Sequence, residues 1–97
     1  MRAVHWNKMA RLDYYDNIEF LLLEWSEKDA QDFIDEVDKT EFILKQGNVD
    51  FQNTDMPAIK RCVICRQITL FYKVLDKHNI EFLRFWNNYQ NDDKLKL

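Results

Sequence analysis

The chain has 97 residues, of which 46% are hydrophobic and 14% aromatic, with one glycine and one proline. This length and composition predict a single globular domain over residues 1–97 and exclude a disordered, fibrous or two-domain protein. No segment approaches the roughly 18 consecutive apolar residues of a membrane span, and the N-terminal stretch lacks the apolar core of a signal peptide. We therefore expect a cytoplasmic protein without a membrane partner.

The net charge of −3 is unevenly distributed along the chain. Residues 1–55 carry 13 acids and 6 bases, whereas residues 56–97 carry 4 acids and 8 bases. Such an asymmetry indicates a positive face turned toward an anionic partner. An equally good interpretation is that the acids solvate helices and the bases solvate strands.

A strand and a helix are predicted at the start of the chain. Residues 3–6 alternate weakly, as in a short strand, and Asn7 is the expected N-cap of a helix from about Lys8 to Trp25. Apolar side chains recur along this helix every three or four residues, which predicts one buried face. That predicted face comprises Met9, Leu12, Tyr15, Ile18, Leu22 and Trp25.

A second helix follows with almost no linker. Ser26 and Asp29 resemble a capping box, and Gly47 is a typical residue just after a helix that ends near Lys45. Its predicted buried stripe contains one charged residue, Glu41. The stripe comprises Ala30, Phe33, Ile34, Val37, Glu41 and Leu44. The two helices therefore form an antiparallel hairpin.

The second half of the chain is predicted to be a β-meander. Residues 48–57 read as a polar loop, and after Pro57 the hydrophobic period changes from helical to two. The predicted strands are residues 58–65, 68–75 and 80–86. The order β-α-α-β-β-β is that of an α+β fold, a helical hairpin packed on a small antiparallel-rich sheet. Residues 91–97 are expected to be a mobile tail or a short ordered extension.

Both cysteines lie in a C-x-x-C spacing within "IKRCVICRQITLFYKV", residues 59–74. On a strand, Cys62 and Cys65 are expected to point to opposite faces, whereas a zinc or redox pair needs both sulfurs on one turn. His5 and His78 are distant from the pair in the sequence. We therefore expect no metal site and no cofactor, and interpret the cysteines as small strand hydrophobes.

Cations and aromatic residues are interleaved on the same strands. One sheet face is expected to pack on the helices, and the other mixes Arg, Lys and aromatic side chains, which suits RNA or an amphipathic partner segment. A sandwiched core strand with charges at its ends is an equal alternative. The candidate binding residues are Lys60, Arg61, Arg66, Lys73, Arg84 and Trp86.

The element order and three segments resemble the RelE/ParE superfamily of bacterial toxins over nearly the whole chain. The segments are "VHWNKMARLDYYDNIEFLLLEWSEKDAQDFIDEV", "IKRCVICRQITLFYKV" and "IEFLRFWNNYQNDDKL". The resemblance implies the toxin half of a type II toxin–antitoxin pair, neutralised by a small antitoxin laid across the toxin surface. RelE-like members cut mRNA in the ribosome, whereas ParE-like members inhibit DNA gyrase and are not nucleases.

The chain departs from the YoeB-like branch of the nucleases at its acid–base positions. In that branch an Arg precedes the L-x-Y of the middle strand, where this chain has Thr69. A His-Tyr pair follows the Arg of the final strand, and here Arg84 is followed at those places by Trp86 and Asn87. Neither of these two can serve as a general acid or base near neutral pH. The resemblance therefore favours a ParE-like toxin that acts by binding gyrase.

Two alternatives stay open, so that the sequence does not decide whether the chain is an enzyme. A ribosome-dependent mRNA endonuclease would use Arg61, Arg84 and Tyr89 as catalytic residues, the cations for the phosphate and the phenol for proton transfer. A non-toxic partner-binding module would keep the fold alone. In each case the resemblance implies an antitoxin segment with apolar anchors and acids, which suits a basic surface with aromatic residues.

Overall fold

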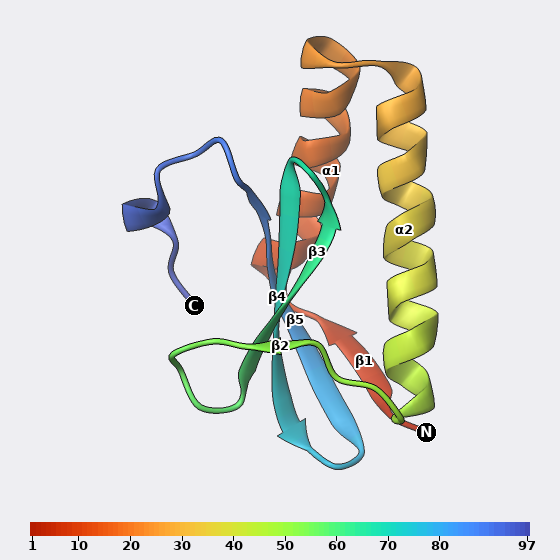
Figure 1. Cartoon of the computed structure of the whole chain (residues 1–97), viewed down its shortest axis with the longest axis vertical. Coiled ribbons are helices and arrows are strands. Elements are labelled where there is room, and N and C mark those ends of the chain that lie inside the picture. The colour runs from red at the N-terminus through yellow and green to blue at the C-terminus, as the bar shows by residue number, and fades with distance from the viewer.

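A computed structural model describes residues 1–97, and its elements follow the predicted order (Figure 1). The elements are β1 (Ala3–Trp6), α1 (Lys8–Glu24), α2 (Glu27–Gln46), β2 (Gln52–Asn53), β3 (Ile59–Cys65), β4 (Ile68–Asp76), β5 (Asn79–Asn87) and the 3₁₀ turn η1 (Asp92–Lys94). The α+β class is confirmed, with β2 added inside the predicted loop. Neither helix combines the length and the hydropathy needed to cross a bilayer.

The strands form one five-stranded sheet in the order β1-β5-β4-β3-β2. Pairings from β2 through β5 are antiparallel, whereas β1 runs parallel to β5, with Ala3 opposite Asn79. The helical hairpin covers one face of the sheet (Figure 1). The opposite face, called the outer face below, is flanked by the loop before β3 and by the C-terminal segment.

Capping residues in the sequence set the helix boundaries. Asn7 Oδ1 accepts the Ala10 N–H at 2.7 Å, and Ser26 Oγ accepts the Asp29 N–H at 3.1 Å. Gly47 ends α2 in the left-handed conformation, with a φ of 79° that glycine adopts at little cost. The predicted starts of both helices and the end of α2 are thereby confirmed.

The buried Arg2 side chain holds the C-terminal end of α2. Its Nε donates to Leu44 O at 3.1 Å, and its Nη2 lies 3.0 Å from an Asp50 carboxylate oxygen. A cation at this end of a helix complements the helix dipole. Tyr72 Oη donates to the same carboxylate at 3.1 Å and accepts the Phe51 N–H at 2.9 Å. The loop after α2 is therefore tied to both the N-terminus and β4.

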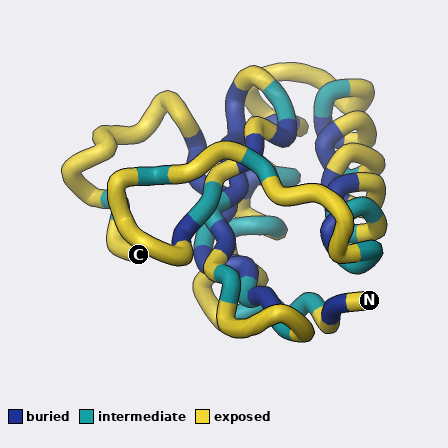
Figure 2. Tube along the Cα trace, turned by 60° about the horizontal axis from the view of Figure 1, so that its bottom comes forward, coloured by how far each residue is buried: buried dark blue, intermediate teal, exposed yellow.

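The core lies between the hairpin and the sheet, where the buried positions gather in Figure 2. Trp6 is partly buried and packs against this core, with its ring 5.2 Å from that of Tyr14 and 5.1 Å from that of Phe85. The Trp6 indole N–H donates to Glu41 at 3.0 Å, which explains the one acid in the predicted stripe of α2. The largest fully buried side chains are Tyr72, Phe33, Phe82, Phe85, Leu21, Leu44, Ile68, Leu70, Ile80 and Val37.

The predicted buried face of α1 is wrong. Five of the six residues assigned to it are between 39% and 66% exposed, and these are Met9, Leu12, Tyr15, Leu22 and Trp25. The buried residues of α1 are instead Ala10, Asn17 and Leu21. Polar side chains of α1 bond to the β5 backbone, as described below, so hydrophobic periodicity misplaces the inner face.

The expectation that the two cysteines lie on opposite faces is also wrong. The register between β3 and β4 shifts between Val63 and Cys65, and this bulge returns Cys65 to the helix side, where Cys62 also lies. Burial raises the pKa of Cys62 to about 11 and also raises the pKa of Cys65. Both thiols are therefore protonated at neutral pH, as expected for small hydrophobes.

Candidate functional site

The outer face of the sheet carries three rows of side chains that cross β3, β4 and β5. The rows are Ile59–Lys73–Glu81, Arg61–Phe71–Arg84 and Val63–Thr69–Trp86. Arg61 and Lys73 are exposed, Arg84 is half-buried and Trp86 is buried. The outer face therefore exposes one cation on β3 and one on β4, whereas its side chains on β5 are largely covered.

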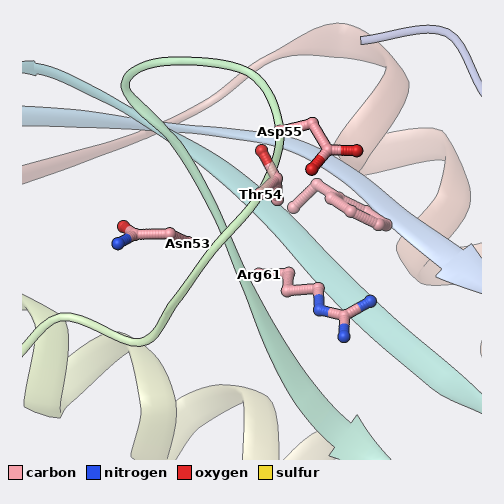
Figure 3. Close-up of a pocket in the computed structure, with 5 residues that line it drawn as sticks. Asn53, Thr54, Asp55 and Arg61 are labelled. Carbon is pink, nitrogen blue, oxygen red and sulfur yellow. The ribbon is translucent and has the colours of Figure 1, made fainter.

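A hollow of about 250 Å³ opens beside Arg61. It is lined by Asn53, Thr54, Asp55, Arg61 and Phe71. Figure 3 shows Arg61 and Asp55 extending to the same side of the sheet, from β3 and from the loop before it, while Asn53 points away. Arg61 Nε donates to Gln52 Oε1 at 3.1 Å, and the guanidinium forms no ion pair.

The loop that borders the hollow is held by its own hydrogen bonds. Thr54 Oγ1 donates to Ile59 O at 2.9 Å and accepts the Met56 N–H at 3.1 Å. The chain returns to β3 through Ala58, whose φ of 68° lies in the left-handed region that non-glycine residues rarely adopt. Because these bonds fix the loop, the rim of the hollow is preformed.

Arg84 forms a bidentate ion pair with Asp13 of α1, at 2.6 and 3.0 Å, with side chains 15% and 12% exposed. Asp13 also accepts the Phe85 N–H at 3.1 Å, and Asn17 donates to Phe85 O at 2.8 Å. β1 pairs with β5 only as far as Phe82, so these α1 side chains satisfy backbone groups on the free edge of β5. Hydrogen bonding to Asp13 raises the pKa of Arg84. The guanidinium therefore has a structural role, since it joins β5 to α1.

Trp86 lies under the C-terminal segment and is 4% exposed. Its indole N–H donates to Asp92 of η1 at 3.1 Å, and the Arg84 guanidinium lies 5.4 Å from its ring centroid, in a cation–π contact. Asn87 is buried too, and its side chain accepts the Tyr89 N–H at 2.9 Å. Trp86 and Asn87 therefore hold the end of β5.

The remaining candidate residues lie away from the hollow. Lys60 belongs to the helix side of β3, and its Nζ donates to Asn53 at 2.6 Å. Arg66 and Tyr89 both pack against Trp25, with the guanidinium 5.2 Å and the phenol ring 6.2 Å from its ring centroid. The cluster of Arg66 and Tyr89 around Trp25 lies at the opposite end of β3 from the hollow. The predicted residues are therefore dispersed: Arg61 and Lys73 lie on the outer face, Arg84 contacts Trp86 on β5, Arg66 and Tyr89 contact Trp25, and Lys60 lies on the helix side.

Sequence reasoning missed two partners of these residues. Asp13 stands 71 positions from Arg84, so no local spacing signals their ion pair. Trp25 is predicted to be in the buried stripe of α1, whereas it is 39% exposed and stacks with Tyr89. Tyr89 stands 64 positions from Trp25, so no local spacing signals this contact either.

Comparison with known proteins relates this chain to solved structures. A scan of protein-family models finds no match. A search of curated proteins finds none either. Among solved structures, the chain is similar to a chain of the chromosomal ParDE TA system from P. aeruginosa, with 20% identity and a TM-score of 0.66 over 90% of this chain and 96% of that chain. At this identity the likeness concerns the fold, which this chain shares with a component of that ParDE system.

Proposed function

We propose that this chain is the toxin of a type II toxin–antitoxin pair, of the ParE-like kind that arrests growth by binding its target. Two separate likenesses support the proposal. The three sequence segments resemble the RelE/ParE superfamily, and the fold matches a chain of a ParDE TA system over 90% of this chain. DNA gyrase is the proposed target, a small antitoxin the proposed partner and the cytoplasm the proposed location.

The observation that carries a binding mechanism is the ion pair between Arg84 and Asp13. A ribonuclease needs a free cation to stabilise the charge that develops on the transferring phosphate. Arg84 already meets a carboxylate in bidentate geometry, with both side chains largely buried. Breaking a buried pair costs about 3–5 kcal/mol, which opposes the use of Arg84 on a phosphate. A toxin that acts by binding does not need this cation.

The antitoxin contact is proposed for the outer face around Arg61. The exposed guanidinium is free of carboxylates, Phe71 lines the hollow beside it, and Val63, two residues along β3, is 65% exposed. A partner segment that places a carboxylate on Arg61 and an apolar side chain over Val63 complements these features. Such a segment matches the acidic and apolar chemistry that the superfamily resemblance implies for the antitoxin.

A ribosome-dependent mRNA endonuclease is the second candidate. Arg61 and Lys73 favour it, because two exposed cations on one face suit a phosphate backbone. Lys73, however, lies opposite Glu81, and Tyr89 belongs to the separate cluster around Trp25. The third candidate, a non-toxic binding module, retains the antitoxin contact and predicts no growth arrest.

The deciding experiment follows DNA and protein synthesis in the minutes after the chain is induced without an antitoxin. We expect DNA synthesis to stop first, and the purified chain to inhibit supercoiling by gyrase while leaving mRNA on translating ribosomes intact. If protein synthesis stops first, the nuclease replaces the binding toxin. If neither changes, the chain is the non-toxic module.

The proposed antitoxin surface is tested by a matched pair of variants. Arg61→Ala and Lys39→Ala each remove one exposed cation, from the outer face and from the solvent side of α2 respectively. We expect Arg61→Ala to weaken binding of the proposed antitoxin about tenfold or more, and Lys39→Ala to leave it unchanged. Calorimetric titration measures both, and equal affinities would contradict the assignment.

A further inference from the structure

The solvent side of α1 carries apolar side chains that the fold leaves uncovered. They are between 45% and 74% exposed, and they are Met9, Leu12, Tyr15, Leu22 and Leu23. At 100° per residue they spread over the side of the helix opposite Ala10, Asn17 and Leu21, which are buried. Surfaces of monomers seldom keep large apolar patches, and on α1 these apolar side chains share the solvent side with exposed charged residues. The solvent side of α1 therefore has the character of an interface.

Charged residues along α1 are sorted by sign, and this sorting identifies the occupant. Lys8 and Arg11 lie in the first turns, whereas Glu19 and Glu24 lie toward the C-terminal end, and all four are exposed. Of the other two acids, Asp13 is paired with Arg84 and Asp16 lies at the middle of the helix. In an antiparallel pair of α1 helices, the basic turns of each copy lie opposite the acidic half of the other. The helix dipoles also run in opposite directions in such a pair. The pattern is therefore complementary to itself.

We infer that α1 is a self-association surface whose occupant is α1 of a second copy, packed antiparallel about a two-fold axis. Centring the axis near the middle of the helix brings Leu12 of one copy against Leu22 of the other and Arg11 within reach of Glu19. The outer face of the sheet is cationic and suits an acidic partner, whereas the mixed charges of α1 suit a copy of α1 itself. This inference is independent of the proposed target and antitoxin.

The size of the contact sets its strength. With 17 residues, α1 is about 25 Å long, and one helix pair of that length buries less than the about 800 Å² per partner of standard stable interfaces. A dissociation constant on the order of 100 µM is therefore expected. The chain is monomeric when dilute and dimeric at high local concentration.

The test is sedimentation equilibrium of the purified chain from about 10 to about 500 µM, a range that brackets the expected dissociation constant. In a symmetric dimer, Arg11→Glu or Glu19→Arg alone places like charges opposite each other, and each is expected to weaken association about tenfold. The double change Arg11→Glu/Glu19→Arg restores opposite signs and returns the constant to within about threefold of the starting value. Lys39→Glu on α2 is the matched control and is expected to have no effect.

Three results would overturn the inference. The first is a chain that stays monomeric at about 500 µM, well above the expected constant. The second is a dimer that ignores both single reversals or responds equally to Lys39→Glu. The third is protection of the α1 side chains from chemical footprinting only when antitoxin is added, which would assign the surface to the antitoxin. Circular dichroism checks that each variant keeps its helix content. Because sedimentation uses the purified chain alone, a monomeric result leaves the toxin proposal standing.

Discussion

Replacing Asp13 by alanine is expected to lower the free energy of unfolding by about 3 kcal/mol. The change removes the carboxylate that faces Arg84 at 2.6 and 3.0 Å and leaves the Phe85 N–H without its acceptor. Breaking a buried pair costs about 3–5 kcal/mol, because one charge is left without compensation. A small hollow of about 40 Å³ beside Arg84 lets water reach the guanidinium, so we expect the low end of this range.

Urea unfolding followed by circular dichroism measures this loss. With a slope of about 1.5 kcal/mol per molar urea for a domain of this size, the midpoint shifts by about 2 M. Asp32→Ala is the matched control, because it removes a carboxylate 2.7 Å from Lys28 in a pair whose side chains are 54% and 84% exposed. That control is expected to cost less than about 0.5 kcal/mol. The double change Asp13→Ala/Arg84→Ala is expected to cost less than the sum of the single changes, because no unpaired charge is left.

Equal midpoints for Asp13→Ala and Asp32→Ala would refute this reasoning. The Arg84–Asp13 pair would then contribute no more than an exposed ion pair, and little would oppose the movement of Arg84 onto a phosphate. The main physical argument for binding over RNA cleavage would be lost with it.

Three further predictions concern the core and the helix ends. Burial raises the pKa of Cys62 from 9.0 to about 11, so the folded state holds the thiol proton more tightly than the unfolded state does. The contribution of this thiol to the free energy of unfolding is fully present below about pH 9. It is lost, by about 2–3 kcal/mol, as the pH rises through 11. Urea midpoints at about pH 8 and about pH 10.5 check this, and Cys62→Ala removes the contribution. Gly47→Ala is expected to cost about 1 kcal/mol in thermal unfolding, since the φ of 79° disfavours a Cβ although the nearest atom would lie 3.6 Å away. Leu21→Ala is expected to cost about 3 kcal/mol in urea and Leu22→Ala less than about 1 kcal/mol, and similar values would contradict the observed inner face of α1.

The elements were predictable because their signals are local. Asn7, Ser26 and Gly47 mark helix ends by hydrogen-bonding capacity and backbone freedom, and all three act as expected. Pro57 precedes the change to a period of two, and the three long strands follow it within one or two residues of the predicted bounds. The class and order of the fold follow from these features alone.

The orientation of side chains was less predictable where polar groups take part in packing. Asp13 and Asn17 lie on the inner side of α1, where they accept the Phe85 N–H and donate to the Phe85 carbonyl on the edge of β5. Hydrophobic periodicity cannot predict this side, because both residues are polar. Cys65 turns to the helix side because of a bulge that no residue in β3 announces. The candidate cations were identified by type, but their division between free and paired depends on contacts distant in the sequence, as in Arg84.

The parallel pairing of β1 with β5 also sets an order of events in folding. The hairpin and the meander are built from contacts between neighbours in the chain, whereas Ala3 pairs with Asn79, 76 positions away, so we expect this contact to form after most of the chain is ordered. Loop-closure entropy opposes that contact in an open chain, so β1 docks late. Its docking brings the Asn7 N–H to Phe82 O at 3.1 Å and fixes the start of α1. Changes that weaken β1 are therefore expected to speed unfolding and to leave the folding rate nearly unchanged.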